Sequence, residues 1–354
     1  MEHPLDGRVR GISLPDYPDL LSRISEIDEF KGWWRGRYPA VPARLGGRRK
    51  KVVAASAAAS IRIGWIGLPQ PHPGIAPGGR PAGEGRPPPA VRYARALEAV
   101  FDGYARMILT QDLLRRFHAD LADDPPEVRA PRGAYRTSPG GPSSLPRRTV
   151  ESIALRPADP EAIPQHLETL IRWTTSRLSD PRFHPLLVVA VFLLEFLAIQ
   201  PFAAGNGRVS RLLTNLLLLQ GGYTYMPYAS LEEAILDRKA EYYLALRKSQ
   251  ASRSLLRPDM APWFVAFLDA LRIQVRGLRS LLERQPREDR YSENQRGVMA
   301  LLDRHRDVTN RLVTGELGLP RETAKQVLNR LVALNAIERI GSGRATRYRR
   351  TGGG

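Results

Sequence analysis

The sequence predicts a mainly α-helical protein that ends in a small helical module of its own. Apolar residues recur at helical spacing through most of the chain. These amphipathic segments follow one another without alternating strands, which is the pattern of a helical bundle. A chain of 354 residues is long enough for two or three domains and a sizeable core.

The first 90 residues combine one amphipathic helix with a segment rich in proline and glycine. Residues 14–38 place their apolar side chains at helical spacing. From residue 39 to residue 90 proline and glycine become dense, above all within 67–89, and repeated proline blocks helix formation. We therefore expect residues 1–90 to form an N-terminal helical region in which 39–90 is a disordered or poorly ordered loop.

Residues 91–284 contain the main helical core. The apolar stretch Leu186–Ile199 includes Glu195 and is shorter than the roughly 20 apolar residues that span a membrane, so it predicts a buried helix. No signal segment opens the chain, and a cytoplasmic protein is expected. Helical periodicity covers 91–122, a turn-rich loop occupies 123–150, and further helices are expected at about 160–178, 185–199, 208–220, 230–250 and 260–284.

The composition narrows the chemistry and the partners. The chain has no cysteine, which excludes disulfides, thiolate metal sites and thiol catalysis. Its net charge of +18 comes mostly from arginine and favours anionic partners such as nucleic acid, nucleotides or acidic protein surfaces. Arginine enrichment in a GC-rich genome explains the charge equally well, so composition alone does not choose a partner.

A glycine-rich loop with two arginines, between two apolar helices, is the strongest functional signal. Residues 205–208 read Gly-Asn-Gly-Arg directly before a helix, whose N-terminus offers unpaired N–H groups to a phosphate. Gly205 and Gly207 let the backbone approach the anion closely. Arg208 and Arg211 are three residues apart, so both project near one face and can clamp a di- or triphosphate. A helix–helix turn whose glycines serve geometry only is the plain alternative.

Residues 200–211 resemble the signature loop of the Fic family, enzymes that move AMP from ATP onto hydroxyl side chains. That signature reads His-x-Phe-x-(Asp or Glu)-Gly-Asn-Gly-Arg-x-x-Arg. The resemblance implies that Phe202 anchors the loop in the core and that Gly205, Asn206 and Gly207 bind the α-phosphate of ATP. It also implies that Arg208 and Arg211 contact the outer phosphates. The matching positions are Phe202, Gly205, Asn206, Gly207, Arg208 and Arg211.

Two positions of the loop depart from the signature. Gln200 replaces the histidine, and a side-chain amide does not accept a proton near neutral pH. Ala204 replaces the acidic residue and offers no ligand to Mg²⁺, so magnesium binding is doubtful. The resemblance therefore implies a protein that binds ATP with impaired or absent transferase activity. An active AMP transferase that modifies Ser, Thr or Tyr of a protein is the alternative. In such an enzyme Glu195 would have to replace the histidine as the base.

The resemblance extends to two further places in the helical core. Tyr135, Arg136 and Thr137 are similar to the flap that docks the target segment by main-chain pairing, so a small flap hairpin is expected. Tyr242 and Tyr243 lie where the family offers aromatic contact to the adenine. Ordinary core packing is the other interpretation of these two tyrosines.

Many Fic proteins also carry an inhibitory helix that reads (Ser or Thr)-x-x-x-Glu-(Gly or Asn). Its glutamate pairs with the second motif arginine, which is Arg211 in this chain. The nearest match here begins at Ser60 and has Gly64 in place of the glutamate. The resemblance thus implies that the inhibitory carboxylate has been lost together with the catalytic residues.

Residues 292–350 resemble a winged helix-turn-helix. Three short helices precede two short strands around a glycine turn. Basic residues on the expected recognition helix and wing could meet DNA phosphates. A protein–protein or homodimer module with a basic surface fits the same pattern. The basic residues are Arg321, Lys325, Arg330, Arg344, Arg347, Arg349 and Arg350.

Overall fold

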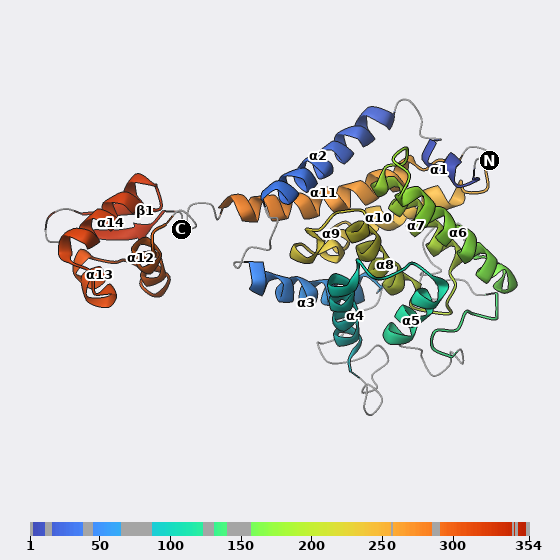
Figure 1. The fold of residues 1–354 in the computed structure, drawn as a ribbon, viewed down its shortest axis with the longest axis horizontal. Helices are drawn as coiled ribbons and strands as arrows, with labels where there is room; N and C mark the ends of the chain where they lie inside the picture. The colour runs from blue at the N-terminus through green and yellow to red at the C-terminus, as the bar shows by residue number, and fades with distance from the viewer. Residues whose placement is uncertain are drawn as a thin grey trace. The chain divides into compact units, whose positions relative to one another are not determined.

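The chain folds into two compact units, Met1–Leu278 and Arg279–Gly354 (Figure 1). In the described residues the first unit is helical, and the second adds a two-stranded sheet. The prediction of a mainly α-helical protein is therefore confirmed. The computed structural model describes residues 3–10, 16–37, 45–64, 87–122, 131–139, 157–255, 258–284, 291–341, 343 and 346–351.

The helices of the first unit follow the expected order. The expected helix over 91–122 is divided into α4 and α5, and the one over 230–250 into α9 and α10. Two short 3-10 helices, Pro160–Ala162 and Met226–Tyr228, complete the set. The helices are α1 (Asp6–Arg10), α2 (Tyr17–Arg37), α3 (Gly46–Ile63), α4 (Pro89–Gly103), α5 (Gln111–Leu121), α6 (Ile163–Leu178), α7 (Pro185–Ile199), α8 (Asn206–Gln220), α9 (Leu231–Asp237), α10 (Lys239–Ala251) and α11 (Ala261–Arg284).

Helix α7 lies at the centre of the first unit. Its residues are apolar on every side, so nearly all of them are buried, and α6 and α8 pack directly against it. Helix α8 also packs against α4 and α5. Because both α7 and α8 are buried, the loop between them is held at a defined place in the core. No helix in the described ranges combines the length and the apolar character needed to cross a membrane.

Helix α3 shows that the expectation of a loop over 39–90 is wrong for residues 46–63. The segment 54–59 is alanine apart from Ser56, and alanine is the strongest helix former. Buried side chains such as Val52 and Val53 then pack α3 against α4 and α9. The proline- and glycine-rich residues 65–86, to which the argument from composition applied most directly, lie outside the described residues.

Ion pairs tie α1 to the core. Asp6 accepts hydrogen bonds from Trp173 Nε1 at 2.8 Å and from two nitrogens of Arg177 at 2.7 and 2.8 Å. These bonds, that from Arg177 above all, hold the pKa of Asp6 at about 2. Arg8 pairs with Glu195 of α7 at 3.0 Å, and Arg253 lies 3.6 Å from the same carboxylate. Glu195 is therefore a core residue between two arginines and not a substitute base.

Replacing Asp6 by asparagine is expected to lower the free energy of unfolding by about 2 kcal/mol at neutral pH, because a buried charge-assisted hydrogen-bond set is lost. The pKa of Asp6 is lower in the folded chain than in the unfolded chain. Its stabilisation is therefore complete above about pH 4 and is lost as the pH falls towards about 2. Urea unfolding at pH 7 and at pH 3 measures this. The difference between parent and Asp6→Asn should be smaller at pH 3, and an equal difference would contradict the assignment.

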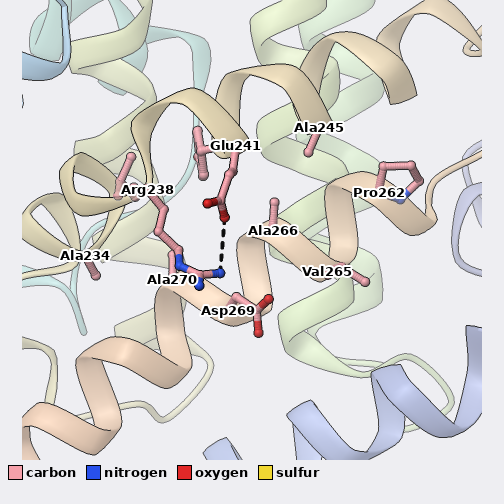
Figure 2. A pocket seen from close by; sticks show the side chains of 11 residues that line it. Ala234, Arg238, Glu241, Ala245, Pro262, Val265, Ala266, Asp269 and Ala270 are labelled. Carbon is pink, nitrogen blue, oxygen red and sulfur yellow. Dashed lines mark ion pairs between the residues drawn. The ribbon is translucent and has the colours of Figure 1, made fainter.

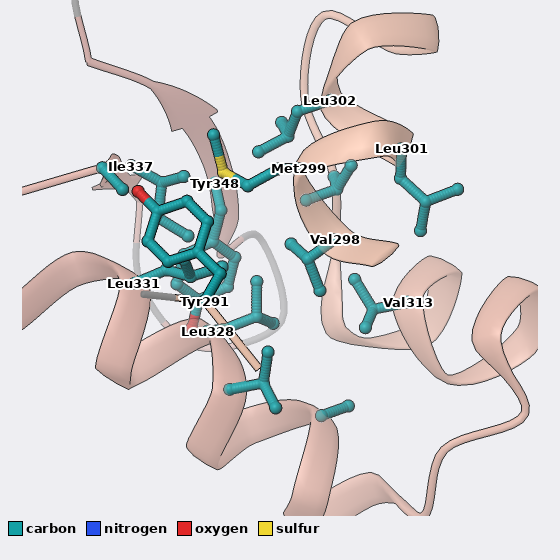
Figure 3. Close-up of a cluster of buried hydrophobic side chains, with 14 residues drawn as sticks. Tyr291, Val298, Met299, Leu301, Leu302, Val313, Leu328, Leu331, Ile337 and Tyr348 are labelled. Atoms are coloured by element: carbon teal, nitrogen blue, oxygen red, sulfur yellow. The ribbon is translucent and has the colours of Figure 1, made fainter. Parts of the chain in front are cut away.

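The second unit has a hydrophobic core of its own (Figure 3). It contains α12 (Glu293–Arg304), α13 (Asn310–Leu317) and α14 (Arg321–Ala333), followed by β1 (Ile337–Ile340) and β2 (Arg347–Arg350), which pair antiparallel. These are the elements that the sequence predicts here, and their assignment as a winged helix-turn-helix stays a prediction. The core includes Val298, Leu301, Val313, Leu328, Leu331, Ile337 and Tyr348.

Candidate phosphate-binding site

Hydrogen bonds between its own residues stabilise the loop between α7 and α8. Helix α7 ends at Gln200, whose φ of 48° lies in the left-handed region, and Gly205, with φ 78°, is the N-cap of α8. The buried Phe202 N–H donates to Asn206 Oδ1 at 3.0 Å, and Asn206 Nδ2 donates to the Phe202 carbonyl at 2.7 Å. The Asn206 side chain thus stabilises the loop, and its main-chain N–H is available to an anion.

The N–H groups at the start of α8 have no acceptor among the residues that the structure describes. Those of Gly205, Asn206 and Gly207 donate no hydrogen bond to any residue that the structure describes. The bonds of the first turn begin only with the N–H groups of Arg208 and Val209, which both donate to the Gly205 carbonyl. Unpaired N–H groups at the positive end of a helix dipole bind anions. The backbone of this loop therefore fits a phosphate.

Arg211 brings a positive charge to the same loop. It is 6% exposed, and its Nε and Nη2 donate to the hydroxyl and the main-chain carbonyl of Ser60 at 2.9 and 2.8 Å. Its Nη1 lies beside the loop, since a β-carbon on Gly207 would be 3.3 Å from it. Within the described parts of the chain, no carboxylate forms an ion pair with Arg211. Arg208 is half-buried, with Nη2 close to Gly205.

Lys239, at the start of α10, is a further cation near the loop. Its Nζ donates to the main-chain carbonyl of Arg62 at 3.0 Å, at the C-terminal end of α3. Burial lowers the pKa of Lys239, and the nearby charges of Arg211 and Arg62 lower it further. Lys239 belongs to no sequence motif, and only the packing of the helices brings it near Arg211.

The expected inhibitory segment lies beside Arg211, as its match in sequence suggests. Ser60 contacts the guanidinium directly, and Gly64 ends α3 four residues later with an ordinary helical φ of −66°. Residues four apart share a helix face, so a side chain at 64 would lie near the same guanidinium. Gly64 supplies no carboxylate there, and the inhibitory role of the segment stays a prediction.

Arg136 of the expected flap is a structural clamp. It is 3% exposed, and its main-chain N–H donates to the Pro201 carbonyl at 2.9 Å. Its guanidinium donates to the carbonyls of Gln200 at 2.7 Å and Ile199 at 3.3 Å, and also to Ala158. These bonds satisfy carbonyls at the end of α7 and hold Gln200 in its left-handed conformation.

The other two expected flap residues, Tyr135 and Thr137, are less buried than Arg136. Tyr135 is half-buried and its hydroxyl donates to Gln111 at 2.9 Å, whereas Thr137 is exposed. Residues 131–139 contain no strand. A flap hairpin would need residues 140–156 as well, and these lie outside the described residues, so the hairpin stays a prediction.

His118 of α5 joins the flap to the loop, and the sequence pattern did not single it out. Its Nδ1 accepts the Gly133 N–H at 3.0 Å, so a neutral ring carries its proton on Nε2, which donates to the Ala204 carbonyl at 3.2 Å. The ring stacks on Phe202 with centroids 4.0 Å apart. Both ring nitrogens are engaged, so His118 supports the loop and does not replace the missing base.

The two positions that the resemblance assigns to catalysis hold no catalytic group. Gln200 ends α7, and Ala204 contributes its carbonyl to His118. Over the described ranges, no cluster of three or more His, Asp or Glu side chains could hold a metal ion. The residues present at the loop do not fit a magnesium ion held by a carboxylate of the loop.

Tyr242 is a core residue. It is 7% exposed and packs edge-on against Trp263 of α11, with ring centroids 4.9 Å apart. It also lines a cavity of about 180 Å³ between α9, α10 and α11, where Arg238 pairs with Glu241 (Figure 2). No residue of 200–211 lines this cavity, so it is not the phosphate site. Adenine contact by the half-buried Tyr243 stays a prediction.

These features define a class of protein: a helical bundle in which a loop with unpaired N–H groups lies between two buried helices and is followed by an arginine of the next helix. Residues 108–218, which run from the start of α5 almost to the end of α8, match the model of the Fic/DOC family. This part of the chain is a Fic/DOC domain. The family prediction made from the loop is therefore confirmed.

Known relatives agree with this assignment. Over 90 residues the chain is 30% identical to protein adenylyltransferase fic-1 of Caenorhabditis elegans, a stretch that makes up 25% of this chain and 16% of that protein. The match thus spans a small part of that relative's length.

Two solved structures share the fold. A Fic family protein from Desulfovibrio desulfuricans is 25% identical, with a TM-score of 0.57 over 95% of this chain and 97% of that one. A Fic domain containing signaling protein from Bacteroides thetaiotaomicron is 18% identical, with a TM-score of 0.54 over 72% of this chain and 98% of that one. At 18% identity the second likeness speaks for the fold alone.

Proposed function

We propose that this chain binds the phosphates of ATP at residues 205–211 and that its protein adenylyltransferase activity is impaired or absent. One observation carries the proposal. The loop combines unpaired N–H groups at 205–207 with the guanidinium of Arg211, which has no carboxylate partner among the described residues, while positions 200 and 204 hold neither a base nor a metal ligand. The Fic/DOC domain and the similarity to an adenylyltransferase support the choice of ATP.

ATP binding and AMP transfer place different demands on the loop. Charge-assisted hydrogen bonds from N–H groups and guanidinium to phosphate are roughly twice as strong as neutral ones, and the chain keeps the groups that make them. Loss of a positioned base removes a factor of about 10²–10⁴ in rate. Binding and catalysis therefore depend on different residues, and only the first set is present.

Calorimetric titration with ATP tests the proposal. The parent chain should bind ATP saturably, and Arg211→Ala should bind it at least about tenfold more weakly, because a charged hydrogen-bond donor is removed. Arg182→Ala is the matched control, since Arg182 is an exposed arginine paired with Asp180 and should leave the affinity unchanged. A parent chain that takes up no ATP would refute the proposal.

An active AMP transferase remains the alternative. Incubation of the parent chain and a cell lysate with magnesium and ATP labelled at the α-phosphate distinguishes the two. Label on a protein target at rates typical of enzymes would favour the alternative, whereas saturable ATP binding without transfer supports the proposal.

DNA binding by the second unit is a second candidate function. Arg321, Lys325 and Arg330 are exposed on α14, as a recognition helix requires. Arg347 is exposed on β2, whereas Arg344 lies outside the described residues. The remaining arginines of the expected wing are partly neutralised: Arg349 pairs with Asp307 at 2.6 Å and Arg350 with Asp303 at 3.3 Å.

The full chain should therefore bind duplex DNA with an affinity that falls steeply with added salt. In Arg321→Ala/Arg330→Ala, the slope of log affinity against log salt should decrease by about two, one for each lost phosphate contact. An unchanged slope in that double variant would argue against α14 as the DNA-binding element.

A further inference from the structure

We infer that Ser60 on α3 is a positioning residue for the phosphate site, because it holds the Arg211 guanidinium in the orientation that leaves Nη1 beside the loop. The inference rests on the proposed ATP binding and adds to it a second element, outside the loop, on which that binding depends. It gives α3 a supporting role, the opposite of the inhibitory role that its sequence suggests.

Two hydrogen bonds from the Arg211 guanidinium to Ser60 form the contact, which we call the grip. A guanidinium is planar, with its donors in a rigid fork, so two hydrogen bonds from one edge define its plane. Nε and Nη2 of Arg211 both bond to Ser60, at 2.9 and 2.8 Å. The remaining nitrogen, Nη1, is the one close to Gly207. Ser60 itself is fully buried in a well-packed helix, so the grip has little freedom to move.

A chain of buried hydroxyls supports the grip. The Tyr93 hydroxyl of α4 donates to Glu232 Oε1 at 2.8 Å and lies within hydrogen-bonding reach of the Ser60 hydroxyl. Since the Ser60 hydroxyl accepts a hydrogen bond from Arg211, its own O–H can donate to the Tyr93 oxygen, and the Tyr93 O–H donates to Glu232. Every hydroxyl in this chain therefore accepts one hydrogen bond and donates one. Asn215 also donates to Glu232 at 2.9 Å.

This arrangement explains how a buried arginine and a buried glutamate coexist without touching. Glu232 is 1% exposed and Arg211 is 6% exposed, and charges at such depth need compensation. The two hydroxyls, on Ser60 and Tyr93, connect the charges by directed hydrogen bonds. Because Glu232 is two hydroxyls away, it balances the charge of Arg211 without covering Nη1, which stays available to a phosphate oxygen.

Ser60→Ala separates a positioning contact from an inhibitory one. The variant removes the hydroxyl and keeps the main-chain carbonyl. If Ser60 positions Arg211, ATP affinity falls, by about tenfold for one charge-assisted hydrogen bond. If Ser60 withdraws Arg211 from the phosphates, affinity rises. Because Arg211 is expected at the outer phosphates, the loss should be seen with ATP and with inorganic triphosphate, and not with AMP.

Ser56→Ala is the matched control. Ser56 is 1% exposed, lies one turn earlier on the same face of α3 and loses a comparable buried hydrogen bond, to Ser230 at 2.8 Å. Its ATP affinity should equal that of the parent chain. ATP binding that is unchanged or tighter in Ser60→Ala, or reduced equally in Ser56→Ala, would overturn the inference.

The failure of this inference can be distinguished from the failure of the proposed function. If the parent chain binds no ATP, the proposed function fails. The contact between Ser60 and Arg211 is then tested without a ligand, by hydrogen exchange of the Arg211 guanidinium. The Nε–H resonance of Arg211, assigned by its absence in Arg211→Lys, should exchange slowly with solvent in the parent chain and in Ser56→Ala, and rapidly in Ser60→Ala. Equal exchange in all three chains would show that Ser60 does not hold the guanidinium.

Discussion

A chain that carries both Gln200→His and Ala204→Asp is expected to transfer AMP from ATP, whereas the parent chain transfers little or none. A positioned base contributes a factor of about 10²–10⁴ in rate, and a carboxylate at 204 offers magnesium the ligand that the loop lacks. The double variant should therefore exceed the parent by at least about 10²-fold. The effect is expected to be large because the loop keeps the N–H groups and the arginine that we propose as the phosphate ligands.

The backbone accepts both substitutions. Histidine is among the residues found more often in the left-handed region, so it suits the φ of 48° at position 200. The hydrogen bonds from Arg136 to the carbonyls of Ile199 and Gln200 involve main-chain atoms and do not depend on the side chain. Ala204 likewise contributes its carbonyl to His118, which an aspartate would keep.

Transfer is measured with ATP labelled at the α-phosphate, in the presence of magnesium. The two single variants are the controls: Gln200→His is expected to recover part of the activity and Ala204→Asp none, because only the first supplies a base. A double variant that binds ATP as well as the parent chain but transfers no label would show that the loop is not organised for catalysis.

Replacing Gly64 by glutamate is expected to weaken ATP binding by about a hundredfold. A side chain at 64 shares the face of α3 on which Ser60 meets Arg211, so the new carboxylate can pair with that guanidinium. A bidentate arginine–carboxylate pair is among the strongest polar contacts, and ATP would have to displace it. The backbone permits the change, since φ is −66° and a β-carbon would lie 3.5 Å from the Ile61 carbonyl, an ordinary contact.

Gly64→Gln is the control for size, because glutamine has the same shape without the charge. Its ATP affinity should stay within about threefold of the parent chain, the scale of a neutral hydrogen bond. Equal weakening by glutamine and glutamate would mean that bulk at position 64 is the cause, and it would contradict an electrostatic contact with Arg211.

The parts of the fold that the sequence predicts well are those that depend on local pattern. The uniformly apolar stretch at 186–199 predicts a buried helix, and the glycines and arginines after it predict an anion-binding turn. Helix α3 was missed because the prolines and glycines that follow it dominated the composition of 39–90, although an alanine-rich run lies within. A break of one residue between two helices, such as Arg238 between α9 and α10, does not change the spacing of apolar residues enough to be predicted.

Local sequence pattern predicts the side-chain contacts of the candidate site less completely than it predicts the helices. Arg211 and Ser60 are 151 residues apart in sequence, and their contact exists only because α3 packs beside α8. His118 and Lys239 could not be found from spacing, since tertiary packing brings His118 to the loop and Lys239 near Arg211. Arg136 and Asn206 were assigned to binding, yet their side chains are committed to the protein's own main chain. Sequence pattern identified the residue types, and packing decides which of them face a ligand.

The most direct test of the account is the amide spectrum of the parent chain during titration with ATP. The resonances of Gly205, Asn206 and Gly207 should shift saturably with ATP and should not shift with adenosine, because the phosphates are the groups that these N–H donors bind. The three resonances can be assigned by selective glycine and asparagine labelling. Shifts that are absent at these residues, or that are equally large with adenosine, would contradict the claim that this loop holds the phosphates of a nucleotide.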